Sequence, residues 1–393
     1  MKIKNNPWFG AEMRLISVIL FIVEFVRGAV LISLLPIYGQ KNLGLSLDII
    51  GVAITAHYLT DTLLKMAIGY LLDRFSIRFV VQIGLLLSLL GVFLFQFAET
   101  GWLFIAASAL YGIGMSPIWI VCLTKVTSDQ RATQMGFLYT IWFVGLGSGP
   151  IVCNILLDYN AAFTYYLLLA LATISWLLSF FMSSARANDL KPIPIRDQFT
   201  VLASQLRQMR LLLPGMILQT AGASMLVPVL PSFAEKHLGI PGAQYSLLLT
   251  LGGIFAAAGM MPMGRLSDKL DSKKSFLVFG FFIFAFGLYV LALKLPFWYC
   301  LIIAIALGLS YAAILPSWNA LLAAYVPPKQ EGLGWGILST IEGLGVMIGP
   351  LAGGFIAASY GEPSVVWISA VLFALIGLFY LFLPSKVLSG SSH

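Results

Sequence analysis

Long apolar segments alternate with short polar ones along almost the whole chain. Each apolar segment is about as long as the roughly 20 residues that a helix needs to cross the hydrocarbon core of a membrane. The pattern therefore predicts an all-α integral membrane protein with twelve transmembrane helices. The predicted spans are 13–38, 48–72, 79–98, 102–125, 134–157, 161–183, 209–234, 243–266, 275–294, 297–325, 332–358 and 364–383.

One polar stretch divides these spans into two groups of six. Residues 184–208 are too polar to cross a membrane and contain prolines and basic residues, as linkers do. We therefore expect an N-terminal six-helix bundle at 1–183, a cytoplasmic linker at 184–208 and a C-terminal six-helix bundle at 209–385. Residues 386–393 resemble the remnant of a linker or tag and are not expected to belong to the fold.

The composition agrees with a membrane protein. Hydrophobic residues make up 60% of the 393 residues and charged residues 10%, whereas an ordinary soluble protein is nearer a quarter charged. The mean hydropathy is +0.94. The three cysteines, Cys122, Cys153 and Cys300, lack the spacing of metal ligands, so we expect buried thiols and neither a bound metal nor another cofactor.

Basic residues are distributed unevenly between the two sets of loops. Most of the 23 Lys and Arg residues fall on the side of the N-terminus, whereas Lys41, Lys236 and Lys294 fall on the opposite side. Because cytoplasmic loops carry an excess of Lys and Arg, both termini are expected in the cytoplasm. This bias, together with anionic lipid headgroups as partners, explains the net charge of +7, and no nucleic-acid partner is indicated.

Two predicted spans carry charged residues near their middles. Glu24 and Arg27 lie three positions apart in the first span, while His57, Asp61 and Lys65 lie four apart in the second. Residues at these spacings share a helix face. A charge at the centre of a spanning helix costs on the order of 2.5 to 3.5 kcal/mol, so these side chains are expected to line a wet cavity or a substrate path. The alternatives are an ion pair that only fixes helix packing, a packing role for His57, and a Lys65 that extends toward the cytoplasmic surface.

The two groups of spans are repeats of each other. The matched positions are Leu35 and Leu230, Gly44 and Gly239, Asp73 and Asp268, Arg74 and Lys269, Arg78 and Lys273, Trp119 and Trp318, and Pro150 and Pro350. Two similar bundles that meet at a central seam can rock about it and expose one site alternately to either side of the membrane. The repeat therefore favours a transporter.

Two of the repeated segments resemble a known family. Residues 69–78 and 264–274 are similar to the loop motif of the major facilitator superfamily, although Ser76 stands where glycine is usual. The resemblance implies the major facilitator fold and a charged latch that holds one conformation. The latch residues would be Asp73, Arg74, Arg78, Asp268 and Lys269. Residues 345–354 are similar to the glycine-proline motif of the superfamily's antiporters, and close helix packing explains them equally well.

The charged positions of the first half have uncharged counterparts in the second half. Gln219, Gly222 and Ala256 occupy the positions that match Glu24, Arg27 and Asp61. We therefore expect a cavity with one polar and one apolar wall, suited to an amphiphilic ligand. Tryptophans beside this cavity would stack on sugar or drug rings, with simple packing as the alternative.

Several further segments resemble the LtaA-type flippases, which move the glycolipid anchor of lipoteichoic acid across the membrane. These segments are 24–28, Asp61, 116–119, Trp142, 213–219 and 316–319. The resemblance implies a proton-coupled flippase of a bacterial cytoplasmic membrane, with diglucosyl diacylglycerol as substrate and Asp61 or Glu24 as proton carrier. The expected substrate-binding residues are Glu24, Arg27, Asp61, Trp119, Trp142, Gln219, Trp318 and Asn319.

Other functions stay open at this point. A proton-driven multidrug exporter also needs an acidic, aromatic and partly apolar cavity, and Glu342 in the eleventh span is a carboxylate suited to a cationic drug. A membrane-embedded enzyme is not expected, because the sequence contains no Ser/His/Asp arrangement, metal-ligand spacing or phosphate loop. We expect a monomer whose partners are protons, membrane lipids and an amphiphilic small molecule or glycolipid.

Overall fold

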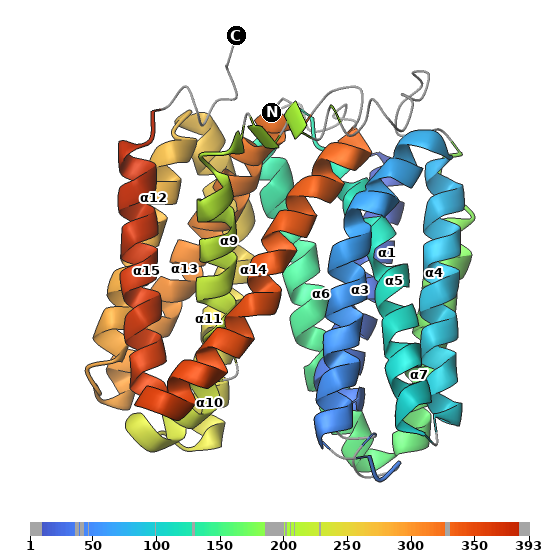
Figure 1. Ribbon diagram of the computed structural model, residues 1–393, viewed down its shortest axis with the longest axis horizontal. Coiled ribbons are helices and arrows are strands. Elements are labelled where there is room, and N and C mark those ends of the chain that lie inside the picture. The colour runs from blue at the N-terminus through green and yellow to red at the C-terminus, as the bar shows by residue number, and fades with distance from the viewer. Residues whose placement is uncertain are drawn as a thin grey trace. The chain divides into compact units, whose positions relative to one another are not determined.

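The computed structural model describes residues 10–35, 39, 43–45, 47–98, 100–127, 130–184, 200, 203–204, 206–207, 209–227, 229–326 and 331–384. These residues form helices joined by short connections and contain no β-strand, as the hydrophobic pattern predicts (Figure 1). Most of the predicted linker, 184–208, and all of the predicted tail, 386–393, lie outside the described residues.

The helices of the N-terminal half follow the predicted spans. They are α1 (Ala11–Gly28) with a π-helical continuation (Ala29–Leu34), α3 (Leu47–Arg74), α4 (Ile77–Leu94) with a 3-10 turn (Phe95–Phe97), α5 (Gly101–Thr124), α6 (Arg131–Tyr159) and α7 (Ala161–Ser179). Helix α5 packs against α3 and α4, and α7 packs against α1 and α4.

The helices of the C-terminal half repeat this arrangement. They are α9 (Leu213–Ser224), α10 (Leu230–Ser232) with a π-helical continuation (Phe233–His237), α11 (Gly242–Lys269), α12 (Lys273–Leu291), α13 (Phe297–Leu322) with a 3-10 turn (Ala323–Tyr325), α14 (Glu331–Tyr360) and α15 (Glu362–Phe382). Helix α13 packs against α11 and α12, and α15 packs against α9 and α12. The duplication seen in the sequence is therefore also present in the packing.

Ten helices in the described part of the chain are long and apolar enough to cross a membrane. The other two predicted spans are not among these ten helices. Helix α3 carries buried charged side chains in its middle, and the span predicted at 209–234 is interrupted between α9 and α10, where Pro231 begins a new helix. Large apolar side chains such as Phe279, Trp298 and Phe355 are strongly exposed, as contact with lipid requires.

The described helices belong to two compact units. The first consists of Met1–Lys125, Ile141–Ile193 and Pro327–Thr340, and the second of Val126–Thr140, Pro194–Val326 and Ile341–His393. Each unit contains most of one predicted bundle, but the first turns of α6 belong to the second unit and the first turns of α14 to the first. The contiguous bundles predicted at 1–183 and 209–385 stay a prediction.

The structure corrects one position of the sequence repeat. Arg78 Nε donates to the carbonyl oxygen of Met182 at 2.6 Å, and Lys274 Nζ donates to the carbonyl oxygen of Leu383 at 2.7 Å. Arg78 therefore corresponds to Lys274, not to Lys273. The register shifts by one residue at Asp271, which adopts the left-handed region with φ +43°.

Glycines allow close contact between helices in each unit. A Cβ atom at Gly145 of α6 would lie 2.9 Å from the carbonyl oxygen of Phe21 and 3.1 Å from the Cβ of Glu24 on α1. In the glycine-proline segment of α14, a Cβ at Gly349 would meet the carbonyl oxygen of Ala221 on α9 at 2.5 Å. Any larger side chain would separate these helix pairs, so close packing accounts for the motif.

Candidate functional site

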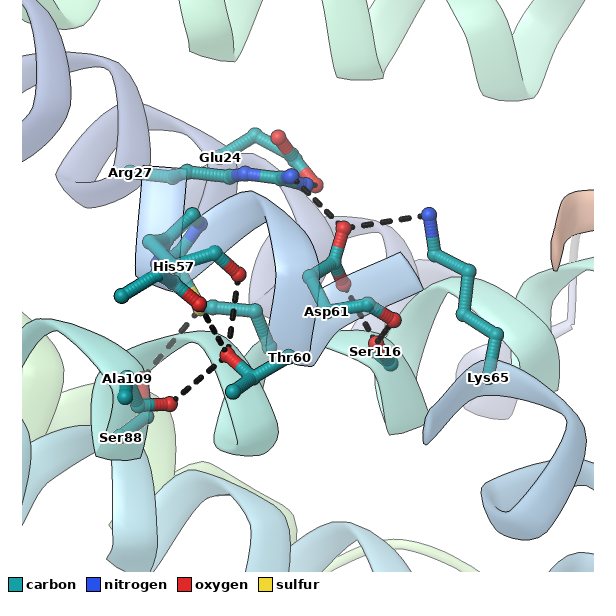
Figure 2. A network of polar contacts seen from close by, with 11 residues as sticks. Glu24, Arg27, His57, Thr60, Asp61, Lys65, Ser88, Ala109 and Ser116 are labelled. Atoms are coloured by element: carbon teal, nitrogen blue, oxygen red, sulfur yellow. Dashed lines mark hydrogen bonds and ion pairs between the residues drawn. The ribbon is translucent and has the colours of Figure 1, made fainter. Parts of the chain in front are cut away.

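Four charged side chains from α1 and α3 meet inside the first unit, and we name this group the ion cluster (Figure 2). Arg27 Nη2 lies 2.9 Å from Asp61 Oδ2, and Lys65 Nζ lies 3.1 Å from the same oxygen. Arg27 Nη1 lies 3.7 Å from Glu24 Oε1. The helical spacing of each pair places both of its members on one face of its helix, and the contact between Arg27 and Asp61 joins the two helices.

The ion cluster is buried and balanced in charge. Glu24 and Asp61 are only 1% and 2% exposed, and the side chains of Arg27 and Lys65 are 14% and 15% exposed. Charges at membrane depth are tolerated where they pair with one another. Two carboxylates facing two cations meet this condition, and removal of any one member leaves an uncompensated charge.

The two carboxylates are held unequally. Asp61 contacts Arg27 and Lys65, and its Oδ1 also accepts a hydrogen bond from Ser116 Oγ on α5. Glu24 has only the longer contact with Arg27, and its Oε2 has no hydrogen-bond partner among the described residues. The ionised form of Asp61 is therefore the better stabilised of the two.

The geometry contradicts the alternative in which Lys65 extends toward the cytoplasmic surface. Its Nζ folds back onto Asp61 one turn earlier instead of extending toward the membrane surface. His57 packs as expected, with its ring centroid 5.1 Å from that of Tyr111 on α5. Thr60 lies between His57 and Asp61 in the sequence of α3. Its Oγ1 donates to the carbonyl oxygen of Ala109 on α5 at 2.9 Å, which helps to fix the crossing of the two helices (Figure 2).

Two tryptophans of the first unit, on α5 and α6, form a pair. The rings of Trp119 on α5 and Trp142 on α6 lie 6.3 Å apart and are tilted by 48°. Trp119 follows Ser116 by three residues, and Trp142 precedes Gly145 by three, so each shares a helix face with a residue that touches Asp61 or Glu24. Both rings are partly exposed, as a binding surface requires.

The predicted C-terminal site residues lie in the second unit. Gln219 and Trp318 line one cavity, and Trp318 Nε1 donates to Glu342 Oε1 at 2.9 Å. Asn319 is buried, and its Nδ2 donates to the carbonyl oxygen of Leu315 at 3.0 Å. The wall expected to be apolar therefore contains the carboxylate of Glu342. The repeat comparison missed it because Glu342 has no charged counterpart in the first half.

Asp73 and Asp268, the two acids of the predicted latch, cap helices. Asp73 accepts hydrogen bonds from the backbone N–H groups of Gly332 and Leu333 at 3.1 and 2.9 Å, at the start of α14. Asp268 accepts from the N–H of Thr133 at 2.8 Å, at the start of α6. Each carboxylate thus faces the positive end of a helix dipole. Burial raises the pKa of Asp73 to about 6.

The basic residues of the predicted latch have other positions. The guanidinium of Arg74 lies 4.5 Å from the centre of the Tyr70 ring, and Lys269 is exposed. Asp268 pairs instead with Lys273, at 3.5 Å. The acids contact helix starts rather than the basic residues of their own motif, with Lys273 as the exception among the contacts described.

The sequence analysis named Lys65 and the segment 116–119, but it did not include Lys65 or Ser116 among the substrate-binding residues. The spacing of Asp61 and Lys65 was a sufficient signal for a salt bridge within one helix. Ser116 carries no such signal, because a serine in an apolar span is usually a packing residue. Across the described ranges, no group of His, Cys, Asp and Glu side chains is placed to hold a metal ion.

The chain matches the family model described as Major Facilitator Superfamily over residues 16–217 and 212–392. It is 31% identical over 383 residues to the proton-coupled antiporter flippase LtaA of Staphylococcus haemolyticus, which covers 96% of this chain and 95% of that protein. The protein of the same name from Staphylococcus aureus strain N315 is 29% identical over 380 residues and covers 96% of each chain.

Solved structures show the same fold. The human organic anion transporter MFSD10 aligns with a TM-score of 0.77 at 15% identity, over 94% of this chain and 98% of that one. The transporter FucP in its outward conformation aligns with a TM-score of 0.74 at 16% identity, over 96% and 99% of the two chains.

These relatives are transporters and not enzymes, and the predicted fold of two six-helix repeats is confirmed by the family match. The buried, charge-balanced cluster on α1 and α3 is a feature that a membrane protein keeps for a polar task rather than for packing with lipid. The protein belongs to the major facilitator superfamily and is a multi-pass membrane transporter.

Proposed function

We propose that the protein flips a glycolipid across the cytoplasmic membrane in exchange for protons, by alternating access. The glycolipid would be of the diglucosyl diacylglycerol class that anchors lipoteichoic acid. The supporting observation is the ion cluster, whose charges balance and whose acidic residues contact Ser116 and Gly145, each three residues from Trp119 or Trp142 on its own helix. Similarity to the flippases named LtaA points the same way.

A neutral sugar head suits this site better than a charged one. Sugar hydroxyls both donate and accept hydrogen bonds, so they satisfy the carboxylates and the cations together. A charged head group would instead upset the balance between Glu24, Arg27, Asp61 and Lys65. Tryptophan rings supply flat apolar faces for the sugar ring.

Glu24 is the better candidate for the proton carrier. Asp61 is stabilised as an anion by two cations and a hydroxyl group, whereas one oxygen of the buried Glu24 is left without a hydrogen-bond partner among the described side chains. A proton drives transport only if the two conformations bind it with different affinities. Movement of Arg27 toward or away from Glu24 would produce that difference.

The proposal also includes the orientation of the protein in the membrane and its oligomeric state. Both termini lie in the cytoplasm, because most basic residues fall on their side of the membrane. The proposal includes a monomer, because the ion cluster and the tryptophan pair both lie in the first unit of a single chain.

Reconstitution into sealed vesicles tests this function. Wild-type protein should move a fluorescent diglucosyl diacylglycerol between leaflets faster than phosphatidylglycerol with the same label, and a pH gradient should accelerate the movement. Equal movement of both lipids would refute the glycolipid assignment. The alternative, a multidrug exporter, is favoured by the Glu342 carboxylate, and it predicts pH-driven accumulation of a cationic dye in the same vesicles without glycolipid movement.

A further inference from the structure

A small cavity lies inside the C-terminal unit, apart from the ion cluster. Its volume is about 110 Å³, and it is bordered by residues of α9, α12, α13, α14 and α15. Drug-sized ligands occupy pockets of roughly 300 to 1,000 Å³. The cavity therefore suits a molecule of only a few heavy atoms.

Two of the polar groups that line the cavity are hydrogen-bond acceptors. The carboxylate of Glu342 accepts a hydrogen bond from Trp318 Nε1 at 2.9 Å. Gln219 is 8% exposed, and its carbonyl oxygen Oε1 is buried without a hydrogen-bond donor among the described residues. A buried acceptor without a donor is costly. A ligand that donates hydrogen bonds would remove that cost.

The other walls of the cavity are aromatic. They are formed mainly by Phe281, Tyr311, Trp318 and Phe373, and the rings of Phe281 and Phe373 are stacked with centroids 5.9 Å apart. Aromatic faces attract cations through their quadrupole, and rings arranged around a carboxylate are a common binding site for an ammonium group. The charge of the carboxylate and the rings favour the same kind of ligand.

Comparison with the first half of the chain supports a separate task for this cavity. At the repeat positions of Trp318 and Glu342, the first half has Trp119 and Trp142, whose rings pair at 6.3 Å. A carboxylate thus stands where the first half has an indole. The first half has a proposed sugar site at this position, and the second half has a site for a cation.

We propose that this cavity binds a small protonated amine. The ammonium group lies among the aromatic rings and donates hydrogen bonds to the Glu342 carboxylate and to Oε1 of Gln219. The short alkyl part fills the rest of the cavity. The proposal is independent of which lipid the protein flips.

Titration of the purified full-length protein in detergent tests the proposal. Ethylammonium chloride, at constant ionic strength, should bind saturably by calorimetry and change tryptophan fluorescence through Trp318, whereas ethanol, a neutral molecule of similar size, should not. Glu342→Gln should weaken binding by about tenfold or more, because hydrogen bonds to a charged group are lost. Gln219→Leu should also weaken it.

Two controls separate this site from other effects. Asp271→Asn removes a carboxylate that is 96% exposed at its side chain, and Glu24→Gln removes one from the ion cluster, and neither should change ethylammonium affinity. Ethylammonium that binds no better than ethanol, or equally well to Glu342→Gln, would overturn the proposal. If thermal melting shows that Glu342→Gln is unfolded, the test depends on Gln219→Leu. Equal affinity of Gln219→Leu and wild type for ethylammonium would then overturn the proposal.

The amine has two sources, a soluble molecule or the head group of a lipid. The titration is therefore repeated in nanodiscs of phosphatidylglycerol with and without phosphatidylethanolamine. A lower apparent affinity for ethylammonium in the presence of phosphatidylethanolamine identifies the lipid as the source. An unchanged affinity identifies a soluble amine.

Discussion

The guanidinium of Arg27 lies closer to Asp61, on a different helix, than to Glu24, one turn away on its own helix. The two distances are 2.9 and 3.7 Å. Asp61 also has Lys65 at 3.1 Å, so the cations gather around one carboxylate and leave the other less compensated. This asymmetry assigns different tasks to the two acids, and separate substitutions test each task.

Asp61→Asn should destabilise the protein. The substitution leaves Arg27 and Lys65 buried without their carboxylate, and breaking a buried pair costs about 3 to 5 kcal/mol. Thermal melting in detergent, followed by fluorescence, measures the loss. The double variant Asp61→Asn with Lys65→Met removes one positive and one negative charge and should recover part of the stability. A single variant as stable as wild type would show that the cluster is not held by these charges.

Glu24→Gln should cost less stability than Asp61→Asn, because Glu24 has only the longer contact with Arg27, but it should abolish the acceleration of transport by a pH gradient. Glutamine has the same size as glutamate, but it cannot release a proton. Transport in vesicles with and without a pH gradient measures the effect. Exposed Glu235→Gln serves as a matched control and should behave as wild type. If Glu24→Gln keeps the full acceleration, Asp61 returns as the candidate carrier.

The sequence predicted the members of the ion cluster better than their pairing. Helical spacing is sufficient to bring Glu24 near Arg27 and Asp61 near Lys65. The contact between Arg27 and Asp61 depends on how α1 and α3 are rotated about their axes, and spacing within one helix carries no information on that. The rotation follows from packing that involves the whole unit, including the approach of α6 to α1 at Gly145.

The sequence repeat predicted the helix packing of the two halves but not every matched position. It predicted that the two halves pack alike, and α13 and α15 do repeat the partners of α5 and α7. It assigned the wrong partner to Arg78, because the extra residue Asp271 occupies a left-handed conformation that an alignment without gaps does not show. It also concealed Glu342, since a new carboxylate has no counterpart to be matched.

Replacing one ring of the tryptophan pair should lower the affinity for the glycolipid and have a smaller effect on the stability of the protein. Trp142→Leu removes a ring that lies 6.3 Å from Trp119, and an aromatic contact contributes about 0.5 to 1.5 kcal/mol beyond its buried area. The expected loss of affinity is roughly two- to tenfold. Binding of diglucosyl diacylglycerol in detergent measures it, with Trp298→Leu, at a ring that is 74% exposed, as control. Equal affinities of the two variants for the glycolipid would show that the tryptophan pair does not contact the substrate.

The contact between Asp73 and α14 should strengthen as the pH falls. Burial raises the pKa of Asp73 from 3.8 to about 6, although the N–H groups of Gly332 and Leu333 oppose this shift. A carboxyl group whose pKa is higher in the contact than in water binds its proton more tightly there. Linkage then favours the contact as pH falls through 6, and the gain ends below about 4.

Hydrogen exchange of the peptide that covers 331–340 measures this contact. Wild-type protection should rise between pH 7 and pH 5 relative to Asp73→Asn, which cannot titrate, and comparison at each pH cancels the pH dependence of exchange itself. Asp268→Asn, the repeat-related variant, removes the cap of α6 and should leave the trend at 331–340 unchanged, because Asp268 contacts Thr133 instead. Parallel curves for wild type and Asp73→Asn would mean that protonation of Asp73 does not act on this contact.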